Sequence, residues 1–179
     1  MKAVLLPVHP EHCFNIGTGK KTIEIRKRHH CPVPPFTGYV YCTKPSTRNR
    51  TISGSMVINT DELFRLPDGR LKHDWSGELM VYPSETWGPD NFLNGKVIGE
   101  FTCNRAIVFS ALPDYSFTPK QIEEICVSRE KLEAYGAGKQ LSGLIIEDFR
   151  LYDRPLTLSE IGISRAPQSW CYVKKEREK

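Results

Sequence analysis

The chain has 179 residues, of which 39% are hydrophobic and 26% are charged, and its formal net charge is +4. This length suits one domain better than two, and no apolar run approaches the roughly 18 residues that a membrane-spanning helix needs. Because the net charge is small, it favours an anionic partner only weakly and does not by itself define a function.

The cysteines and the N-terminal segment bear on the cellular compartment. None of the six cysteines stands in a C-x-x-C pattern, the spacing that zinc knuckles and dithiol redox motifs use. The apolar segment 1–8 is too short for a secretion signal, and no cleavage site follows it. We therefore expect a cytoplasmic protein with reduced cysteines, no metal, no cofactor and no membrane contact.

The N-terminal segment is predicted to form a strand followed by a short helix. Residues 3–8 are a continuous apolar run, as in a buried strand, and Pro10 suits the first turn of a helix. Gly17 or Gly19 would end that helix, because glycine readily adopts the left-handed conformation common after a helix C-terminus.

The next segment alternates apolar and polar side chains. In residues 22–27, Ile23 and Ile25 fall on one face of the chain, whereas Glu24 and Arg26 fall on the other. This period of two predicts a half-buried strand.

The middle of the chain is its least regular part. A strand is expected at residues 38–43, and one or two strands are expected at 96–109. Between them, residues 45–95 contain turn signals and short strand-like pieces near 56–58 and 79–82. This segment is predicted to be an insertion.

Two short helices are predicted next. Thr118 begins a capping box with proline at the first helical position, and Ser128 can cap a second helix that ends at Gly136 or Gly138.

Two further strands complete the pattern. Residues 144–152 are predicted to form one strand, and residues 169–173 a last strand that closes a barrel. Strands thus predominate without alternating with helices, which argues against a doubly wound parallel sheet. The expectation is a single domain over residues 1–179 of mixed β-rich (α+β) class.

The most informative segment is residues 19–26, which fit the pattern G-x-K-x-x-E-x-R. Glycine permits a tight turn between helix and strand, and Lys21 at that turn can reach into a cleft. Glu24 and Arg26 leave the same strand face, so the segment offers a movable cation, an acceptor and a planar fork of donors that can bind a phosphate or a base edge. The competing interpretation is a surface ion pair of Lys21 with Glu24, with Arg26 anchoring a loop.

With this pattern the sequence resembles the ASCH family, whose signature it is. Further similarity lies in residues 41–44 (YCTK), 97–101 (VIGEF) and 165–172 (RAPQSWCY), and is greatest toward the longer members often found in bacteria and phages. The resemblance implies a PUA-like β-barrel with short peripheral helices and a cleft along the signature segment. It also implies RNA binding, the function generally attributed to the family.

The resemblance also suggests an enzymatic alternative. Some compact ASCH proteins are amidohydrolases that remove the acetyl group from acetylated cytidine, and others are described as ribonucleases on single-stranded RNA. By resemblance Lys21 would be the catalytic group, with Glu130 or Glu133 as the assisting glutamate. Glu24 stands where those hydrolases have a threonine. A carboxylate there would pair with Lys21 and keep the amine protonated, which opposes its use as a nucleophile or base.

Further candidates for ligand binding flank the signature. Tyr41 and Lys44 belong to the strand expected beside it, and Gln168 and Ser169 offer hydrogen bonds at the end of the cleft. Trp170 on the last predicted strand is either a core residue or a platform on which a base stacks.

The sequence leaves three functions open. The first is a binding module for RNA or a nucleoside or nucleotide. In it Lys21 and Arg26 contact phosphate, Glu24 contacts a base edge or orients Lys21, and Tyr41 or Trp170 stacks on a base. The second is a hydrolase that acts on an acylated nucleoside or on RNA. The third is a protein-interaction domain that uses residues 45–95 as its contact surface, with no identified partner.

Overall fold

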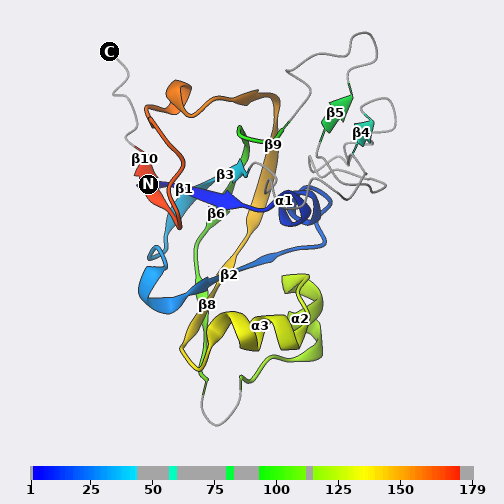
Figure 1. The fold of residues 1–179 in the computed structure, drawn as a ribbon, viewed down its shortest axis with the longest axis vertical. Helices are drawn as coiled ribbons and strands as arrows, with labels where there is room; N and C mark the ends of the chain where they lie inside the picture. Colours follow the sequence, from blue (N-terminus) through cyan, green and yellow to red (C-terminus); the bar gives the residue numbers. More distant parts are fainter. Residues whose placement is uncertain (1, 44–56, 60–79, 83–92, 112–114, 174–179) are drawn as a thin grey trace.

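The computed structural model describes residues 2–43, 57–59, 80–82, 93–111 and 115–173 (Figure 1). The strands are β1 (Lys2–Val8), β2 (Ile23–Lys27), β3 (Phe36–Cys42), β4 (Val57–Asn59), β5 (Met80–Tyr82), β6 (Val97–Cys103), β7 (Ala106–Phe109), β8 (Leu141–Ile145), β9 (Glu147–Leu156) and β10 (Cys171–Val173). The helices are α1 (Pro10–Gly17), α2 (Pro119–Ile125) and α3 (Arg129–Gly136), with 3-10 turns at Arg28–His30 and Ser159–Ile161. The mixed, strand-rich class expected from the sequence is confirmed.

A five-stranded sheet in the order β10-β1-β3-β6-β9 forms the centre of the molecule (Figure 1). β1 and β3 pair in parallel, from Lys2 opposite Phe36 to Val8 opposite Cys42, and the other neighbours pair antiparallel. A parallel pair needs a long crossover connection, which here contains α1 and β2. Apolar side chains of β1, α1, β3 and β6 pack together in the main core.

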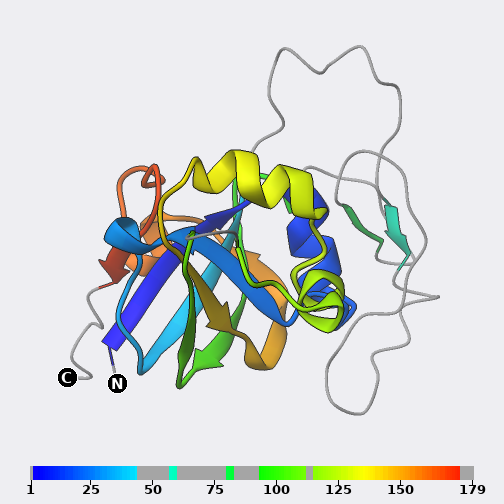
Figure 2. The ribbon, with the colours of Figure 1, turned by 90° about the horizontal axis from the view of Figure 1, so that it is seen from below.

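A second, three-stranded sheet in the order β2-β8-β7 carries the signature strand, with Arg26 opposite Ser142 in the β2–β8 pair. One face of this sheet, which includes Ile23 and Ile25, packs against α2 and α3 in a separate apolar cluster (Figure 2). The other face, with Glu24 and Arg26, is also buried. It faces the end of β1, where Arg26 donates a hydrogen bond to the main-chain carbonyl of Pro7. Both faces of β2 are therefore covered, whereas the sequence predicted a half-buried strand.

The residues at their ends define where the two short helices α2 and α3 begin and end. The Thr118 hydroxyl accepts a hydrogen bond from the backbone of Gln121, whose side chain accepts one from the backbone of Thr118, so the predicted capping box is confirmed. α3 follows Ser128 and ends at Gly136, as predicted, but the Ser128 side chain makes no capping hydrogen bond to the helix backbone. A Cβ at Gly136 would lie 1.9 Å from the hydroxyl oxygen of Tyr115, so this close approach requires glycine.

Two expectations about the C-terminal strands need correction. Residues 144–152 do not form one strand, because the chain leaves the three-stranded sheet after Ile145 and enters the five-stranded sheet at Glu147. Asp148, with a φ of 51°, takes part in this crossover. The final strand β10 pairs with β1 at a sheet edge, and the described strands form separate sheets rather than a closed barrel. Periodicity does not reveal such a crossover, since side chains alternate on both sides of it.

Most of the predicted insertion at residues 45–95 lies outside the described part of the chain. Within it, β4 and β5 pair in parallel close to the strand-like pieces expected at 56–58 and 79–82. None of the helices in the described ranges has the length and apolar content that a membrane crossing needs.

Candidate functional site

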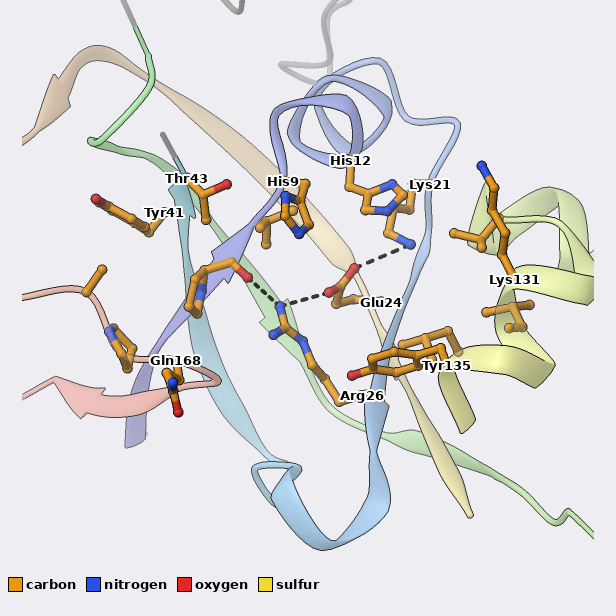
Figure 3. A pocket seen from close by; sticks show the side chains of 17 residues that line it. His9, His12, Lys21, Glu24, Arg26, Tyr41, Thr43, Lys131, Tyr135 and Gln168 are labelled. Carbon is orange, nitrogen blue, oxygen red and sulfur yellow. Dashed lines mark hydrogen bonds and ion pairs between the residues drawn. The ribbon is translucent and has the colours of Figure 1, made fainter. Parts of the chain in front are cut away.

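A cleft of about 670 Å³ opens beside β2 (Figure 3). It is bordered by the end of β1, the start of α1, the end of β3, the helix α3 and residues 166–168. Its volume falls within the roughly 300–1,000 Å³ typical of sites for small molecules. Because its walls come from segments far apart in the sequence, the cleft depends on the tertiary fold.

The signature residues Lys21, Glu24 and Arg26 form what we call the cleft floor. Lys21 Nζ lies 3.3 Å from Glu24 Oε2, and Arg26 Nη2 lies 2.8 Å from Glu24 Oε1. The exposed fractions of the residues are 2%, 6% and 9% in chain order. Charges removed from water in this way are tolerated when they are paired and hydrogen-bonded. The floor is therefore a buried network and not a surface ion pair.

Backbone carbonyls complete this network. Lys21 Nζ donates a hydrogen bond to the carbonyl of Ile125 at 2.6 Å. Arg26 donates through Nη2 to the carbonyl of Pro7 at 2.7 Å and through Nη1 to that of Ser169 at 3.2 Å. The floor thus connects β2 to the end of α2, to β1 and to the segment before β10.

The turn after α1 directs Lys21 inward. Gly19 has a φ of 71°, in the left-handed region that glycine adopts without steric penalty. The backbone N–H of Lys21 donates to Asn15 at 2.9 Å, and that of Thr22 donates to Glu124 at 2.9 Å. β2 therefore starts between α1 and α2, which places the Lys21 side chain beside Glu24. The turn that the pattern G-x-K-x-x-E-x-R predicts is confirmed.

The charges of the floor keep Glu24 ionised. Burial alone raises the pKa of the Glu24 carboxyl, but the positive charges of Lys21 and Arg26 outweigh burial and the pKa is lowered from its usual value. The pKa of His12, which also lines the cleft, is lowered by burial and then by the ammonium of Lys21. Both lowered pKa values favour the ionised carboxylate of Glu24 and the neutral imidazole of His12 in the cleft.

The α3 wall of the cleft holds residues that sequence reasoning missed. Lys131 and Tyr135 both line the cleft, with buried Leu132 between them, and Figure 3 shows them on the side opposite Gln168. Tyr135 is 44% exposed, so its side chain is open to solvent at the cleft wall. Their spacing of four residues places them on one face of the predicted helix, and this was the available signal.

Comparisons with known proteins bear on the fold. No protein-family model and no curated protein matches the chain. The crystal structure of ASCH from Zymomonas mobilis matches with a TM-score of 0.59 and 17% identity, over 97% of this chain and 89% of that one. A structure of a point mutant of that protein matches with a TM-score of 0.59 and 16% identity, over 98% and 92%.

The chain has the fold of an ASCH domain. At this level of identity the likeness shows the fold alone, but it covers nearly the whole of both chains. The sequence resemblance rested on the signature and a few short segments, and the fold agrees with it. In this structure Lys21, Glu24 and Arg26 line the cleft.

The remaining candidates for ligand binding differ in their positions in this ASCH fold. Tyr41 and Gln168 line the cleft, although Tyr41 is only 7% exposed. Ser169 contributes its carbonyl to Arg26. Trp170 packs partly buried against the main core, with its ring centroid 5.1 Å from that of Tyr172, and is not among the residues that line the cleft. Lys44 lies outside the described residues.

The glutamates proposed to assist Lys21 lie on α3. Glu133 is paired with Arg129 at 3.8 Å, and neither Glu130 nor Glu133 is among the residues that line the cleft. At 100° per residue, position 133 points to the opposite side of the helix from Lys131 and Tyr135. Their catalytic role stays a prediction. In the described ranges of the ASCH fold, no group of His, Cys, Asp or Glu is arranged to hold a metal ion.

Proposed function

We propose that the cleft binds a nucleotide unit, either as a free nucleotide or within single-stranded RNA. The observation that carries this proposal is the composition of the cleft wall. Lys21, Arg26 and Lys131 provide positive charge against the single carboxylate of Glu24, and Tyr135 adds a partly exposed ring. An excess of positive charge beside an aromatic ring suits a ligand that combines phosphate with a base.

Different side chains of the cleft contact the phosphate and the base of the ligand. Lys131 is an exposed cation that lines the cleft, and no carboxylate among the described residues pairs with it. It can therefore bind a phosphate without first breaking such an ion pair. Tyr135 can stack on a base, since every base has a π-face. Glu24 orients Lys21 and Arg26, whose donors are directed by their contacts with it and with backbone carbonyls. Tyr135 thus takes the stacking role that the sequence assigned to Tyr41 or Trp170.

The same geometry opposes a lysine-dependent hydrolase. Deacetylation by Lys21 needs an amine that is free to attack, and the amine here contacts the Glu24 carboxylate at 3.3 Å and the Ile125 carbonyl at 2.6 Å. Both contacts engage the amine within the chain, which opposes its use as a nucleophile. Incubation of the protein with acetylated cytidine tests this alternative, and release of cytidine that is lost in Lys21→Ala would establish it.

The binding proposal is tested by titrating a labelled single-stranded RNA by fluorescence anisotropy at several salt concentrations. Lys131→Ala should weaken binding about fivefold at 0.1 M salt, because one phosphate contact contributes roughly 0.7 to the slope of log K against log salt. The matched control is Lys120→Ala, since Lys120 is also an exposed helical lysine but lies on α2 away from the cleft. Equal affinities of the two variants, or no binding of nucleotide or RNA to the wild type, would refute the proposal.

A further inference from the structure

The α3 wall of the cleft continues onto the end of β2. Lys27, the last residue of β2, places its Nζ 5.2 Å from the ring centroid of Tyr135. A cation at this distance over an aromatic face is a favourable contact that holds the ring in place. Because Tyr135 also lines the cleft, Lys27 lies immediately outside the cleft at its rim.

Two more cations adjoin Lys27. The backbone N–H of Arg28 donates to the carbonyl of Gln140 at 3.0 Å, and its Nη1 lies 3.4 Å from Ser142 Oγ. Lys139 precedes Gln140 and donates its own backbone N–H to Gly136 at 3.0 Å. The start of the 3-10 turn and the loop after α3 are therefore adjacent. We call Lys27, Arg28 and Lys139 the cationic rim.

The cations of the rim have no carboxylate partner among the described residues, whereas many other cations on this surface do. Within the described ranges, no carboxylate lies within 4.0 Å of a charged nitrogen of the rim. Elsewhere on the described surface, carboxylates pair with Arg105, Lys120, Arg129, Arg150 and Arg154. A cation without a carboxylate partner can bind phosphate without first breaking an ion pair, so the rim is better suited to a polyanion than those paired positions.

We propose that the cationic rim continues the cleft as a path for a nucleic acid strand, so that the ligand of the cleft is a single strand and not a free nucleotide. This inference rests on the proposed function of the cleft. One nucleotide occupies the cleft against Tyr135, and the phosphates that follow it lie along Lys27, Arg28 and Lys139. A stacking ring in a cleft requires an unpaired base, which excludes the interior of a duplex.

The inference is tested with a length series that runs from a mononucleotide to an eight-nucleotide RNA. The affinity of the wild type should rise with length until the rim is filled. In Lys27→Gln/Lys139→Gln, the affinity for the eight-nucleotide RNA should fall about 25-fold at 0.1 M salt, and its salt slope should fall by about 1.4, which corresponds to two phosphate contacts on a single strand. The affinity for the mononucleotide should fall far less, by at most about fivefold, because Lys27 acts on the cleft only through its contact with the Tyr135 ring.

The control variant Lys20→Gln/Lys120→Gln removes the same net charge from residues that do not line the cleft or the rim. If both double variants weaken RNA equally, the effect is global and the strand path is wrong. The path is also wrong if eight nucleotides bind no more tightly than one, or if a duplex competes as well as the single strand. If neither nucleotide nor RNA binds, the proposed function of the cleft has failed instead. A DNA strand of the same sequence distinguishes RNA from DNA as the source of the strand.

Discussion

Replacing Glu24 tests whether the cleft floor is held together by its carboxylate. In Glu24→Gln the side chain keeps its size but no longer neutralises Lys21 and Arg26, which lie 3.3 and 2.8 Å away and are 2% and 9% exposed. Removing one partner of a buried ion pair costs about 3–5 kcal/mol, because the remaining charge is desolvated and uncompensated. Since two cations share this carboxylate, we expect the free energy of unfolding to fall by at least about 3 kcal/mol.

The measurement is urea and thermal unfolding at pH 7, followed by circular dichroism. For a chain of this size, about 1 kcal/mol shifts Tm by roughly 2–4 °C, so Tm should fall by about 6–12 °C. The control is Glu133→Gln, because Glu133 also pairs with an arginine, but at 3.8 Å and on the surface. Such a pair contributes less than about 1 kcal/mol. If Glu24→Gln unfolds within about 1 kcal/mol of the wild type, solvent must hydrate the floor and our account of it is wrong.

Two further predictions concern the same residues. The pKa of Glu24 is lowered in the folded protein, so its contribution to stability is fully present above its unfolded-state pKa of about 4.3 and is lost as the pH falls through the lower, folded-state value. The difference in unfolding free energy between the wild type and Glu24→Gln should therefore shrink between pH 7 and pH 3, and a constant difference would contradict the lowered pKa. In Arg26→Lys, the two carbonyl contacts at Pro7 and Ser169 cannot both be made by a single ammonium on a shorter side chain. Amide hydrogen exchange should become faster in β10 and at the end of β1 but stay unchanged in β7, whereas unchanged exchange in β10 would show that Arg26 does not hold this segment.

The local elements of this protein could be predicted from its sequence because the signals were local. Pro10 marked the start of α1, and Thr118 with its capping box marked the start of α2. The alternation in β2 placed Glu24 and Arg26 on one face, as the structure has them. The resemblance to ASCH proteins then indicated the fold.

The relations between elements could not be predicted in the same way. The alternation of β2 does not show that its polar face is covered by a second sheet, and this burial is what turns Lys21, Glu24 and Arg26 into a closed network. The crossover after Ile145 was missed because periodicity continues through it. Tyr135 was missed because an aromatic residue on a short helix is usually a core residue.

The donors of the floor are already engaged within the chain. Lys21 and Arg26 reach the carbonyls of Ile125, Pro7 and Ser169, so they fasten together parts of the polypeptide that lie far apart along it. A ligand that accepted hydrogen bonds from Lys21 or Arg26 would have to replace their hydrogen bonds to these backbone carbonyls. The free energy gained from the new hydrogen bonds would then be offset by the loss of the existing ones. Discrimination among ligands then shifts from the base of the cleft toward its wall and rim, where Lys131, Lys27 and Lys139 have no carboxylate partner among the described residues. Sequence variation among proteins that share this floor should accordingly change what is bound mainly through α3 and the end of β2.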